Sequence, residues 1–366
     1  MKIAFLGSRG IPANYSGFET FYEQLATRLA QRGHNVTVFN RYPFVRFKER
    51  FYKGVRIIRL RTITIKSLDT ILHTLFSVLC LPFLKPDVVY FCGVGNAIFC
   101  IPCRWMRIPC IINVDGEDWA RKKWSGFASW WLLQSEGWAS RFADIVIADA
   151  RVIQKRYLEL YSRETLFIPY GANIRKVIPE STILERLGLQ CGEYILFVGR
   201  LVPENRAELL IESFKEVPGN MKLVIVGDAP YSEEYKKSLR ETADPRVVFA
   251  GYVFENDYAA ISLQSAFFCL PSGIDGTRPV LLDQMGFGKC ILLRNSQANL
   301  EVGGDAVATF QGQNELTSLS SAIRRLCNSR EERESLGKAA QKRVADLYDW
   351  EVITTQYEQL FAGFSD

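Results

Sequence analysis

Two arginines and two aspartates follow apolar runs of the sequence that predict buried parallel strands. They are Arg200 and Arg206, after residues 194–198, and Asp275 and Asp283, after residues 266–270. Ligands of open α/β sheets bind beyond the carboxyl ends of such strands, so these side chains stand where a ligand would lie. A guanidinium suits phosphate because its planar fork of donors matches the phosphate oxygens, whereas a carboxylate suits sugar hydroxyls. The pattern therefore predicts a site for a diphosphate with a sugar attached.

Length and composition limit the kind of protein. With 366 residues the chain is too long for one typical core and suits two domains. A hydrophobic fraction of 48%, a charged fraction of 23% and a net charge of +5 are those of an ordinary globular protein and do not indicate nucleic acid binding. No secretory signal is recognisable at the start of the sequence, so a cytoplasmic protein is expected.

The nine cysteines are scattered through strand-like and helix-like stretches, which favours reduced thiols in the cytoplasm. Cys100 and Cys103 form a C-x-x-C pair, as in many zinc sites. However, the sequence has no second C-x-x-C pair and only two histidines, and the residues around the pair are apolar. Buried thiols are therefore expected in place of a zinc site.

Strand-like and helix-like stretches alternate in two separate sets, which predicts two doubly wound parallel sheets (Rossmann-like, α/β) facing a cleft. In the first set a strand and a glycine-containing loop lead into an amphipathic helix at 18–32, whose N-terminus can hold phosphate. The loop lacks the G-x-G-x-x-G spacing, which disfavours an NAD-linked enzyme. A polar stretch near Pro179 separates the sets. We expect domains at 1–172 and 173–347, and a final helix at 348–366 that packs back on the first domain.

Two stretches combine aromatic and basic residues, a composition typical of the water–lipid interface. They are residues 41–61 and residues 119–141, the second within a helix predicted at 121–142. The tryptophans of that helix also suit a domain core, and we prefer this interpretation for most of them. A third stretch, Ile71–Leu84, is apolar but shorter than the ~20 residues needed to cross a bilayer, so it predicts a buried or half-buried helix.

Several short blocks occur in order along nearly the whole chain. They are 7–13 (GSRGIPA), 17–20 (GFET), 93–97 (GVGNA), 113–116 (NVDG), 147–150 (IADA), 168–172 (IPYGA), 199–205 (GRLVPEN) and 276–283 (GTRPVLLD). With these blocks the chain resembles the family 4, or group 1, glycosyltransferases of the GT-B type. The blocks at 7–20 and 113–116 resemble in particular the bacterial subgroup that contains polysaccharide rhamnosyltransferases.

The resemblance implies roles for the residues that match family motifs. Arg200 and Arg206 would bind the donor diphosphate, and Arg206 stands where the family usually has lysine. Asp275 and Asp283 replace a pair of glutamates. Asp283 would accept hydrogen bonds from ribose hydroxyls, and Asp275 would lie near the transferred sugar. The other donor-binding residues that the resemblance implies are Gly17, Gly199, Gly227, Tyr252, Val253, Gly276 and Thr277.

The resemblance also implies an acceptor site. Asp115 stands where many relatives carry a histidine, and it would position the acceptor hydroxyl or take its proton. The alternative is that Asp115 only caps the following helix. Arg9, Asn96 and Glu117 complete the implied acceptor site. The expected catalytic residues are Asp115, Arg200, Arg206 and Asp275.

The implied activity is transfer of a sugar, rhamnose or another hexose, with retention at the anomeric carbon. The donor would be a nucleotide-sugar, and the acceptor a glycan or a polyprenyl-diphosphate-linked glycan in bacterial surface polysaccharide synthesis. The carboxylate candidates form no Asp-x-Asp signature, so neither a metal nor another cofactor is expected. Peripheral contact with an anionic membrane fits the basic aromatic stretches. Two rival interpretations keep the fold: a degenerate, non-catalytic sugar-binding subunit, and a sugar-nucleotide epimerase.

Overall fold

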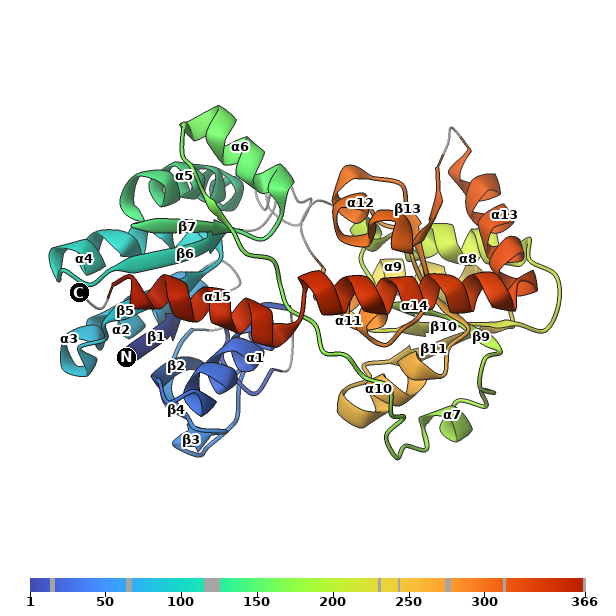
Figure 1. The fold of residues 1–366 in the computed structure, drawn as a ribbon, viewed down its shortest axis with the longest axis horizontal. Coiled ribbons are helices and arrows are strands. Elements are labelled where there is room, and N and C mark those ends of the chain that lie inside the picture. Colours follow the sequence, from blue (N-terminus) through green and yellow to red (C-terminus); the bar gives the residue numbers. More distant parts are fainter. Residues whose placement is uncertain are drawn as a thin grey trace. The chain divides into compact units, whose positions relative to one another are not determined.

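The computed structural model describes residues 1–13, 17–63, 68–114, 126–229, 232–242, 244–273, 278–311 and 314–364. The chain divides into two compact units (Figure 1). Unit 1 comprises Met1–Gly171 together with Trp350–Asp366, and unit 2 comprises Ala172–Asp349. The C-terminal segment therefore belongs with the N-terminal half of the chain.

Among the described residues, unit 1 contains an eight-stranded sheet in the order β3-β4-β2-β1-β5-β6-β7-β8. Neighbouring strands are parallel except for the antiparallel pair β3–β4 at one edge. The central strands are apolar and buried along their length, as expected for a parallel sheet covered on both faces. The strands are β1 (Lys2–Leu6), β2 (Asn35–Tyr42), β3 (Phe51–Tyr52), β4 (Val55–Arg61), β5 (Val88–Cys92), β6 (Cys110–Val114), β7 (Ile145–Ala148) and β8 (Leu166–Phe167).

Helices cover both faces of this sheet. One face is covered by α1 and α15, and helices α2, α4, α5 and α6 pack on the other through a single apolar cluster. The helices of unit 1 are α1 (Gly17–Gln31), α2 (Asp69–Leu79), α3 (Leu81–Leu84), the 3-10 helix η1 (Val94–Phe99), α4 (Cys100–Trp105), α5 (Phe127–Phe142), α6 (Arg151–Tyr161) and α15 (Trp350–Ala362).

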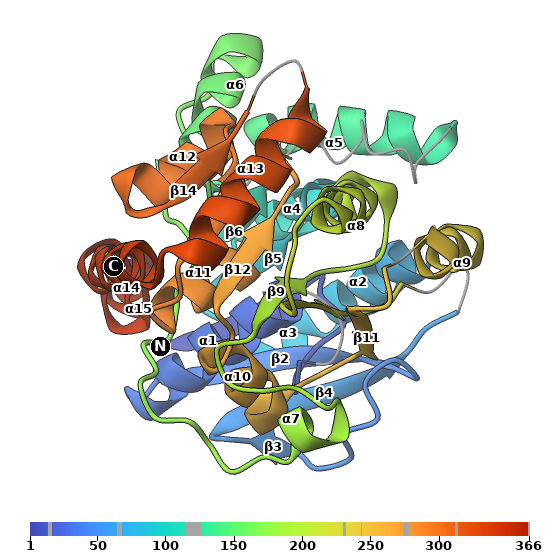
Figure 2. The ribbon, with the colours of Figure 1, turned by 90° about the vertical axis from the view of Figure 1, so that its right-hand side faces the viewer.

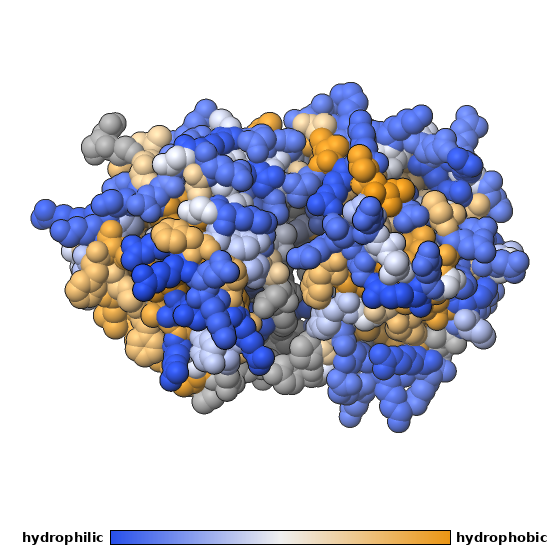
Figure 3. Space-filling model, turned by 90° about the horizontal axis from the view of Figure 1, so that it is seen from below, coloured by the Kyte–Doolittle hydropathy of each residue, from blue (hydrophilic) through white to orange (hydrophobic). Residues whose placement is uncertain are grey.

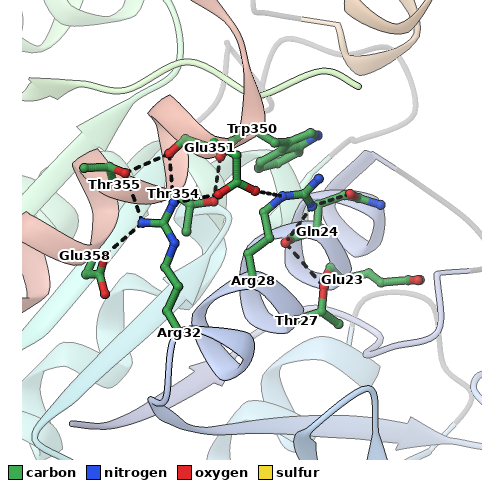
Figure 4. A network of polar contacts seen from close by, with 10 residues as sticks. All are labelled: Glu23, Gln24, Thr27, Arg28, Arg32, Trp350, Glu351, Thr354, Thr355 and Glu358. Carbon is green, nitrogen blue, oxygen red and sulfur yellow. Dashed lines mark hydrogen bonds and ion pairs between the residues drawn. The ribbon is translucent and has the colours of Figure 1, made fainter. Parts of the chain in front are cut away.

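Ion pairs and aromatic packing fix α15 beside α1. Arg32, which follows α1, donates to the carboxylates of Glu351 and Glu358 at 2.8 Å each (Figure 4). Beneath these pairs the buried Tyr357 of α15 packs on Phe21 of α1, with ring centroids 5.6 Å apart. Aromatic pairs at this separation add to the stabilisation that burial alone provides. The expected return of the final helix to the first half of the chain is confirmed.

Unit 2 contains, within its described residues, a six-stranded parallel sheet in the order β11-β10-β9-β12-β13-β14. Its strands are β9 (Tyr194–Val198), β10 (Lys222–Val226), β11 (Val247–Gly251), β12 (Phe267–Leu270), β13 (Ile291–Arg294) and β14 (Ala308–Phe310). The strands are again short apolar runs. β9 and β12 match the apolar runs at 194–198 and 266–270 from which the sequence predicts buried strands.

Helices α8, α9 and α13 lie on one face of this second sheet, and α10, α11 and α14 lie on the other (Figure 2). The helices of unit 2 are α7 (Ile183–Arg186), η3 (Pro203–Asn205), α8 (Ala207–Lys215), α9 (Glu233–Thr242), α10 (Glu255–Leu263), α11 (Pro279–Gly286), α12 (Gln297–Gly303), η4 (Gly304–Ala306), α13 (Glu315–Asn328) and α14 (Arg330–Leu347).

The predicted and observed elements differ in a few places. The helix predicted at 121–142 is described only from Phe127, because residues 115–125 lie outside the described part. The structure adds helices α6, α13 and α14, which no sequence pattern above indicates.

Candidate functional site

The order of strands in unit 2 reverses between β9 and β12. From β9 the chain adds β10 and β11 on one side, and it then returns to place β12, β13 and β14 on the other side. Ligands of such sheets bind at the carboxyl ends of the strands that flank the reversal. Arg200 and Arg206 follow β9, and Asp283 lies in the helix that follows β12. The topology therefore brings the segments that carry these predicted residues to one edge of the sheet.

The ends of β9 and β10 approach each other closely at this edge. Gly227 has a φ angle of +125°, and a Cβ atom there would lie 2.0 Å from the carbonyl oxygen of Gly199. A larger residue at position 227 would be strained and would clash with the backbone. Backbone packing thus requires glycine at position 227, and the donor-binding roles of Gly199 and Gly227 stay predictions.

Arg206 stands between η3 and α8, with its backbone in the left-handed region at a φ of +57°. Its guanidinium lies 2.6 Å from one carboxylate oxygen of Glu315, and Arg294 at the end of β13 donates to the other oxygen at 2.6 Å. The hydrogen bond from Arg206, followed by that from Arg294, holds the pKa of Glu315 below its ordinary value. One carboxylate thus holds two arginines at the sheet edge where an anion is expected.

A third arginine joins this edge from the segment after β12. Arg278 donates to the amide oxygen of Asn205 at 3.4 Å and to the hydroxyl of Ser272. The amide nitrogen of Asn205 donates in turn to the backbone carbonyl of Arg200 at 2.8 Å. The Arg200 side chain is exposed and makes no hydrogen bond or ion pair within the described residues. Asn205 therefore connects the loop after β9 with the segment that leads into α11.

Asp283 lies in α11, half-buried, and its carboxylate accepts a hydrogen bond from the Tyr258 hydroxyl at 3.5 Å. Burial raises the pKa of Asp283 to about 7, and the Tyr258 hydrogen bond opposes this effect only in part. Near neutral pH the carboxyl therefore changes between its acidic and its ionised form. Its hydrogen bond goes to α10 and not to the arginines at the sheet edge, so its ribose-binding role stays a prediction.

Tyr252 and Val253, predicted to border the base, line a cavity of about 370 Å³ beside α7 and α10. Tyr252 is half-exposed and lies parallel to Phe254, with an interplanar angle of 16° and ring centroids 5.8 Å apart. A pair of exposed, parallel aromatic rings offers a flat apolar surface, which suits stacking of a planar ring. The contact of Tyr252 and Val253 with a base stays a prediction.

At the corresponding edge of unit 1, Arg41 at the end of β2 is buried. Its guanidinium donates to the Asp69 carboxylate at 2.9 Å. The assignment of Arg41 to the basic surface at 41–61 is therefore wrong. Burial lowers the pKa of Arg41, and Asp69 offsets part of that effect. Burial and the charge of Arg41 together lower the pKa of the neighbouring His73 to about 3, so His73 stays neutral.

Two predicted acceptor residues of unit 1 are held by other groups in this structure. The Asn96 side chain is buried, donates to the Cys92 carbonyl at 2.6 Å and accepts from Thr74 at 2.8 Å. The guanidinium of Arg9 lies over the Phe44 ring, 4.7 Å from its centroid. Neither arrangement tests acceptor binding, so both roles stay predictions, and Asn96 also has a clear structural role.

The remaining predicted residues are placed as follows. Gly17 is the first residue of α1, where backbone N–H groups are free of intrahelical partners. Asp115, Glu117, Asp275, Gly276 and Thr277 lie outside the described residues. The roles of all six stay predictions.

The cysteines of the C-x-x-C pair agree with the expectation of buried thiols. Cys100, Cys103 and Cys110 are free and buried. Within the described part of the chain, no group of three or more His, Cys, Asp or Glu residues could hold a metal ion. The metal independence of the chemistry stays a prediction.

Sequence reasoning missed four residues of the arginine cluster in unit 2. They are Asn205, Arg278, Arg294 and Glu315. Arg278 and Asn205 lie within the sequence blocks quoted above, so their position beside Arg200 and after β12 was a usable signal. Arg294 and Glu315 lie outside those blocks, and only the folded sheet brings them beside Arg206.

Two protein-family models match the chain. Residues 185–343 match "Glycosyl transferases group 1". Residues 1–173 match a domain of unknown function named DUF1972. The first match covers most of unit 2, and the second covers the N-terminal part of unit 1.

Individual proteins and structures are similar to the chain at low identity. An uncharacterized glycosyltransferase of Methanocaldococcus jannaschii is 22% identical over 270 residues, which are 71% of this chain and 70% of that protein. A lipopolysaccharide 1,2-N-acetylglucosaminetransferase of Salmonella typhimurium is 23% identical over 244 residues, 60% of this chain and 63% of its own length. The structure of Anabaena Alr3699/HepE in complex with UDP and glucose superposes with a TM-score of 0.81 at 20% identity, covering 99% of this chain and 100% of that chain. This likeness confirms the predicted GT-B fold.

Proposed function

We propose that the chain is a glycosyltransferase that moves a sugar from a nucleotide-sugar to a glycan, because residues 185–343 match the group 1 glycosyl transferases. In this proposal residues 173–347 bind the donor and residues 1–172 bind the acceptor. The structure of Anabaena HepE with UDP and glucose supports a UDP-sugar as the donor. The Salmonella relative, a lipopolysaccharide glycosyltransferase, supports a bacterial surface glycan as the acceptor.

The observation that carries the proposal is the arginine cluster at the reversal of the sheet in unit 2. Arg206, Arg278 and Arg294 are held there by hydrogen-bonding partners, and the exposed Arg200 is linked to them through its backbone carbonyl, which accepts from Asn205. Guanidinium groups bind phosphate oxygens through two parallel hydrogen bonds, which makes such a cluster a good match for a diphosphate. Glu315 neutralises only part of the cluster, so a ligand with more negative charge can compete with it.

Catalysis follows from the charge that develops on the leaving diphosphate. When the bond between the sugar and the diphosphate breaks, negative charge collects on the departing oxygens. Arg206, held at the strand ends by Glu315, stabilises that charge with little reorganisation at the moment of reaction, and the exposed Arg200 adds a second guanidinium. The free N–H groups at the start of α8, directly after Arg206, add a positive partial charge. The transfer proceeds with retention at the anomeric carbon.

The proposal also specifies the transferred sugar and the acceptor. The transferred sugar is rhamnose or another hexose, and the acceptor is a glycan or a polyprenyl-diphosphate-linked glycan of a surface polysaccharide. Asp115, with Arg9, Asn96 and Glu117, positions the acceptor hydroxyl or takes its proton. An acceptor on a lipid carrier would bring the chain to the cytoplasmic face of the membrane, where nucleotide-sugars are available.

The test uses the purified full chain with a panel of UDP-, GDP- and dTDP-sugars, with and without EDTA. Removing one group that stabilises transition-state charge typically lowers turnover by ~10²–10³-fold, and we expect such losses for Arg200→Ala and Arg206→Ala. Arg324→Ala, which removes an exposed arginine from α13 of the same unit, is the matched control. Turnover of R200A or R206A close to that of R324A would exclude the diphosphate role. A strict need for a divalent metal would exclude arginines as the main source of charge stabilisation.

A non-catalytic sugar-binding subunit is the second candidate, and Asp283 is the observation that favours it. Aspartate is shorter than the glutamate of the family, and burial raises its pKa to about 7. A carboxyl in this state is a poorer acceptor for ribose hydroxyls than a fully ionised one. Donor binding without hydrolysis or transfer for any member of the panel would favour this candidate.

A further inference from the structure

The exposed and buried faces of α2 are reversed in polarity. Its exposed side carries large apolar residues at helical spacing, namely Leu75, Phe76 and Leu79, with Leu68 just before the helix. Its buried residues are polar apart from Val78, namely Asp69, His73, Thr74 and Ser77. A helix on the surface of a globular protein normally shows the opposite arrangement. The outer face of α2 is therefore suited to contact an apolar partner.

The polar underside of α2 is fixed, so the helix cannot turn its apolar face inward. Asp69 pairs with the buried Arg41 at 2.9 Å, and Thr74 donates to the buried Asn96 at 2.8 Å. If the helix rotated, Arg41 and Asn96 would stay buried without their hydrogen-bonding partners, at a large cost in free energy. The exposed apolar side is thus a built feature of unit 1.

The apolar surface continues over the neighbouring helices. Phe83 of α3 is 87% exposed, and Trp105 of α4 is 82% exposed. Both helices are packed with α2 over one apolar cluster, through residues that include Val78, Leu81 and Cys103. Hydrophobic side chains are visible among hydrophilic ones on the left of Figure 3, where Figure 1 draws unit 1. We call the exposed residues Leu75, Phe76, Leu79, Phe83 and Trp105 the α2–α4 face.

The exposed charges on the segments that form the α2–α4 face have one sign. Lys85, Arg104 and Arg107 are exposed beside it. Between residues 68 and 85, and between residues 94 and 108, the one acidic residue is Asp69, which is buried by its pair with Arg41. Exposed tryptophan and phenylalanine with a cationic border are the composition that binds a lipid surface containing anionic headgroups.

We propose that the α2–α4 face docks unit 1 on an anionic lipid bilayer. None of the described helices is long and apolar enough to cross a bilayer, and α2 itself has 11 residues. The helix therefore lies in the interface, with its leucine and phenylalanine side chains among the upper acyl chains and the cations at the headgroups. This site differs from the stretches 41–61 and 119–141 that sequence composition indicates. It does not depend on which sugar the protein transfers.

The test is sedimentation of the full chain with vesicles of phosphatidylglycerol mixed equally with phosphatidylcholine, and with vesicles of phosphatidylcholine alone. Phe76→Ser with Leu79→Ser should weaken partition into the anionic vesicles by about tenfold or more, because two large apolar groups no longer enter the interface. The matched control is Val177→Ser with Leu347→Ser, which removes two exposed apolar side chains from unit 2. Arg104→Glu should weaken partition roughly fivefold or more, and Lys338→Glu on α14 should not.

The outcomes separate the proposal from its rivals. Vesicle binding that is equal for wild type and F76S/L79S, or absent from the wild type, overturns the proposal. If the wild type instead forms dimers that F76S/L79S abolishes, measured by sedimentation velocity without lipid, the face is an interface between two copies and the proposal is again overturned. Unfolding of F76S/L79S followed through tryptophan fluorescence, measured in parallel, reports whether unit 1 of the variant is folded, because all seven tryptophans lie in that unit. This control leaves the donor assignment to its own test.

Discussion

Each unit of this protein places an arginine at the carboxyl edge of its sheet, paired with a carboxylate, and the two pairs differ in burial. In unit 1 the side chains of Arg41 and Asp69 are 3% and 9% exposed. In unit 2 those of Arg206 and Glu315 are 30% and 21% exposed, and Arg294, at 39%, shares the same carboxylate. The first pair is sealed among β1, β2 and α2, whereas solvent or a ligand can reach the second.

The difference indicates which pair is structural and which can bind a ligand. A buried pair cannot release either partner, because the remaining charge would stay in the protein interior without compensation. A half-exposed pair costs little to separate, because water or an anion can replace the lost partner. We therefore expect Arg41 to contribute to the stability of unit 1, and the exposure of the Arg206 pair fits the proposed binding of a diphosphate in unit 2.

The largest effect that this comparison predicts is on the stability of unit 1. Asp69→Ala leaves Arg41 buried without a counter-ion, and loss of one partner of a buried pair costs about 3–5 kcal/mol. The free energy of unfolding can be measured by denaturation followed through tryptophan fluorescence. All seven tryptophans lie in unit 1, so the signal reports that unit alone.

Two further variants make the stability measurement decisive. Glu351→Ala removes a carboxylate that is 66% exposed in its pair with Arg32 of the same unit, and it should cost less than about 1 kcal/mol. Replacement of both partners, Arg41→Met with Asp69→Leu, should be less harmful than D69A alone, because no unpaired charge remains. Equal losses for D69A and E351A would mean that the Arg41 pair is not specially structural.

The sequence allowed the arginine of unit 2 to be placed correctly but not that of unit 1. Arg206 follows a short apolar run with an evident end, so its position at a sheet edge could be inferred from local pattern. Arg41 also ends a strand, but its burial depends on Asp69, which comes 28 residues later on another element. Local pattern therefore grouped Arg41 with exposed basic residues. Pairing across elements, as between Arg206 and Glu315, is equally invisible before the fold is known.

The sequence also could not predict which face of a helix is buried. The run Ile71–Leu84 is so rich in apolar residues that its pattern predicts a buried or half-buried helix, without telling which side faces inward. The structure buries Asp69 and Thr74, because Arg41 and Asn96 offer them partners, and it leaves leucine and phenylalanine side chains outside. The fold, and the position of Arg206 after a strand of unit 2, could be predicted from local pattern and family resemblance, whereas such partner choices could not.

The next largest effect is the pH dependence of donor binding through Asp283. Its pKa is raised to about 7 from an ordinary value near 4, so the folded protein keeps this proton more tightly than the unfolded chain. Its contribution to stability is therefore present at low pH and is lost as the pH rises from about 4 to 7. The ionised carboxylate is the better acceptor for ribose hydroxyls, so the affinity for a nucleoside diphosphate should fall by up to tenfold per pH unit below 7 if Asp283 contacts the ribose.

Calorimetry checks this expectation directly. Titration of UDP, GDP and dTDP at pH 5.5, 6.5 and 7.5 gives the affinity, and repetition in buffers of different ionisation enthalpy gives the protons released. Asp283→Asn should bind more weakly at pH 7.5 and should show a flatter pH profile. A wild-type profile that D283N leaves unchanged would mean that Asp283 does not contact the nucleotide.

The smallest effect concerns Glu315, and it tests whether the unit 2 pair is separable. Because Glu315 competes with a diphosphate for Arg206, Glu315→Gln should strengthen nucleoside diphosphate binding, by no more than about fivefold since a half-exposed pair contributes at most ~1 kcal/mol. The free energy of unfolding should change by less than about 1 kcal/mol. The control is Glu212→Gln on α8, which loses a similar pair, with Lys215, away from the cluster. If E315Q instead binds nucleoside diphosphate more weakly than E212Q, Glu315 positions Arg206 for the ligand and is not displaced by it. The pair in unit 2 would then be structural, like the pair in unit 1.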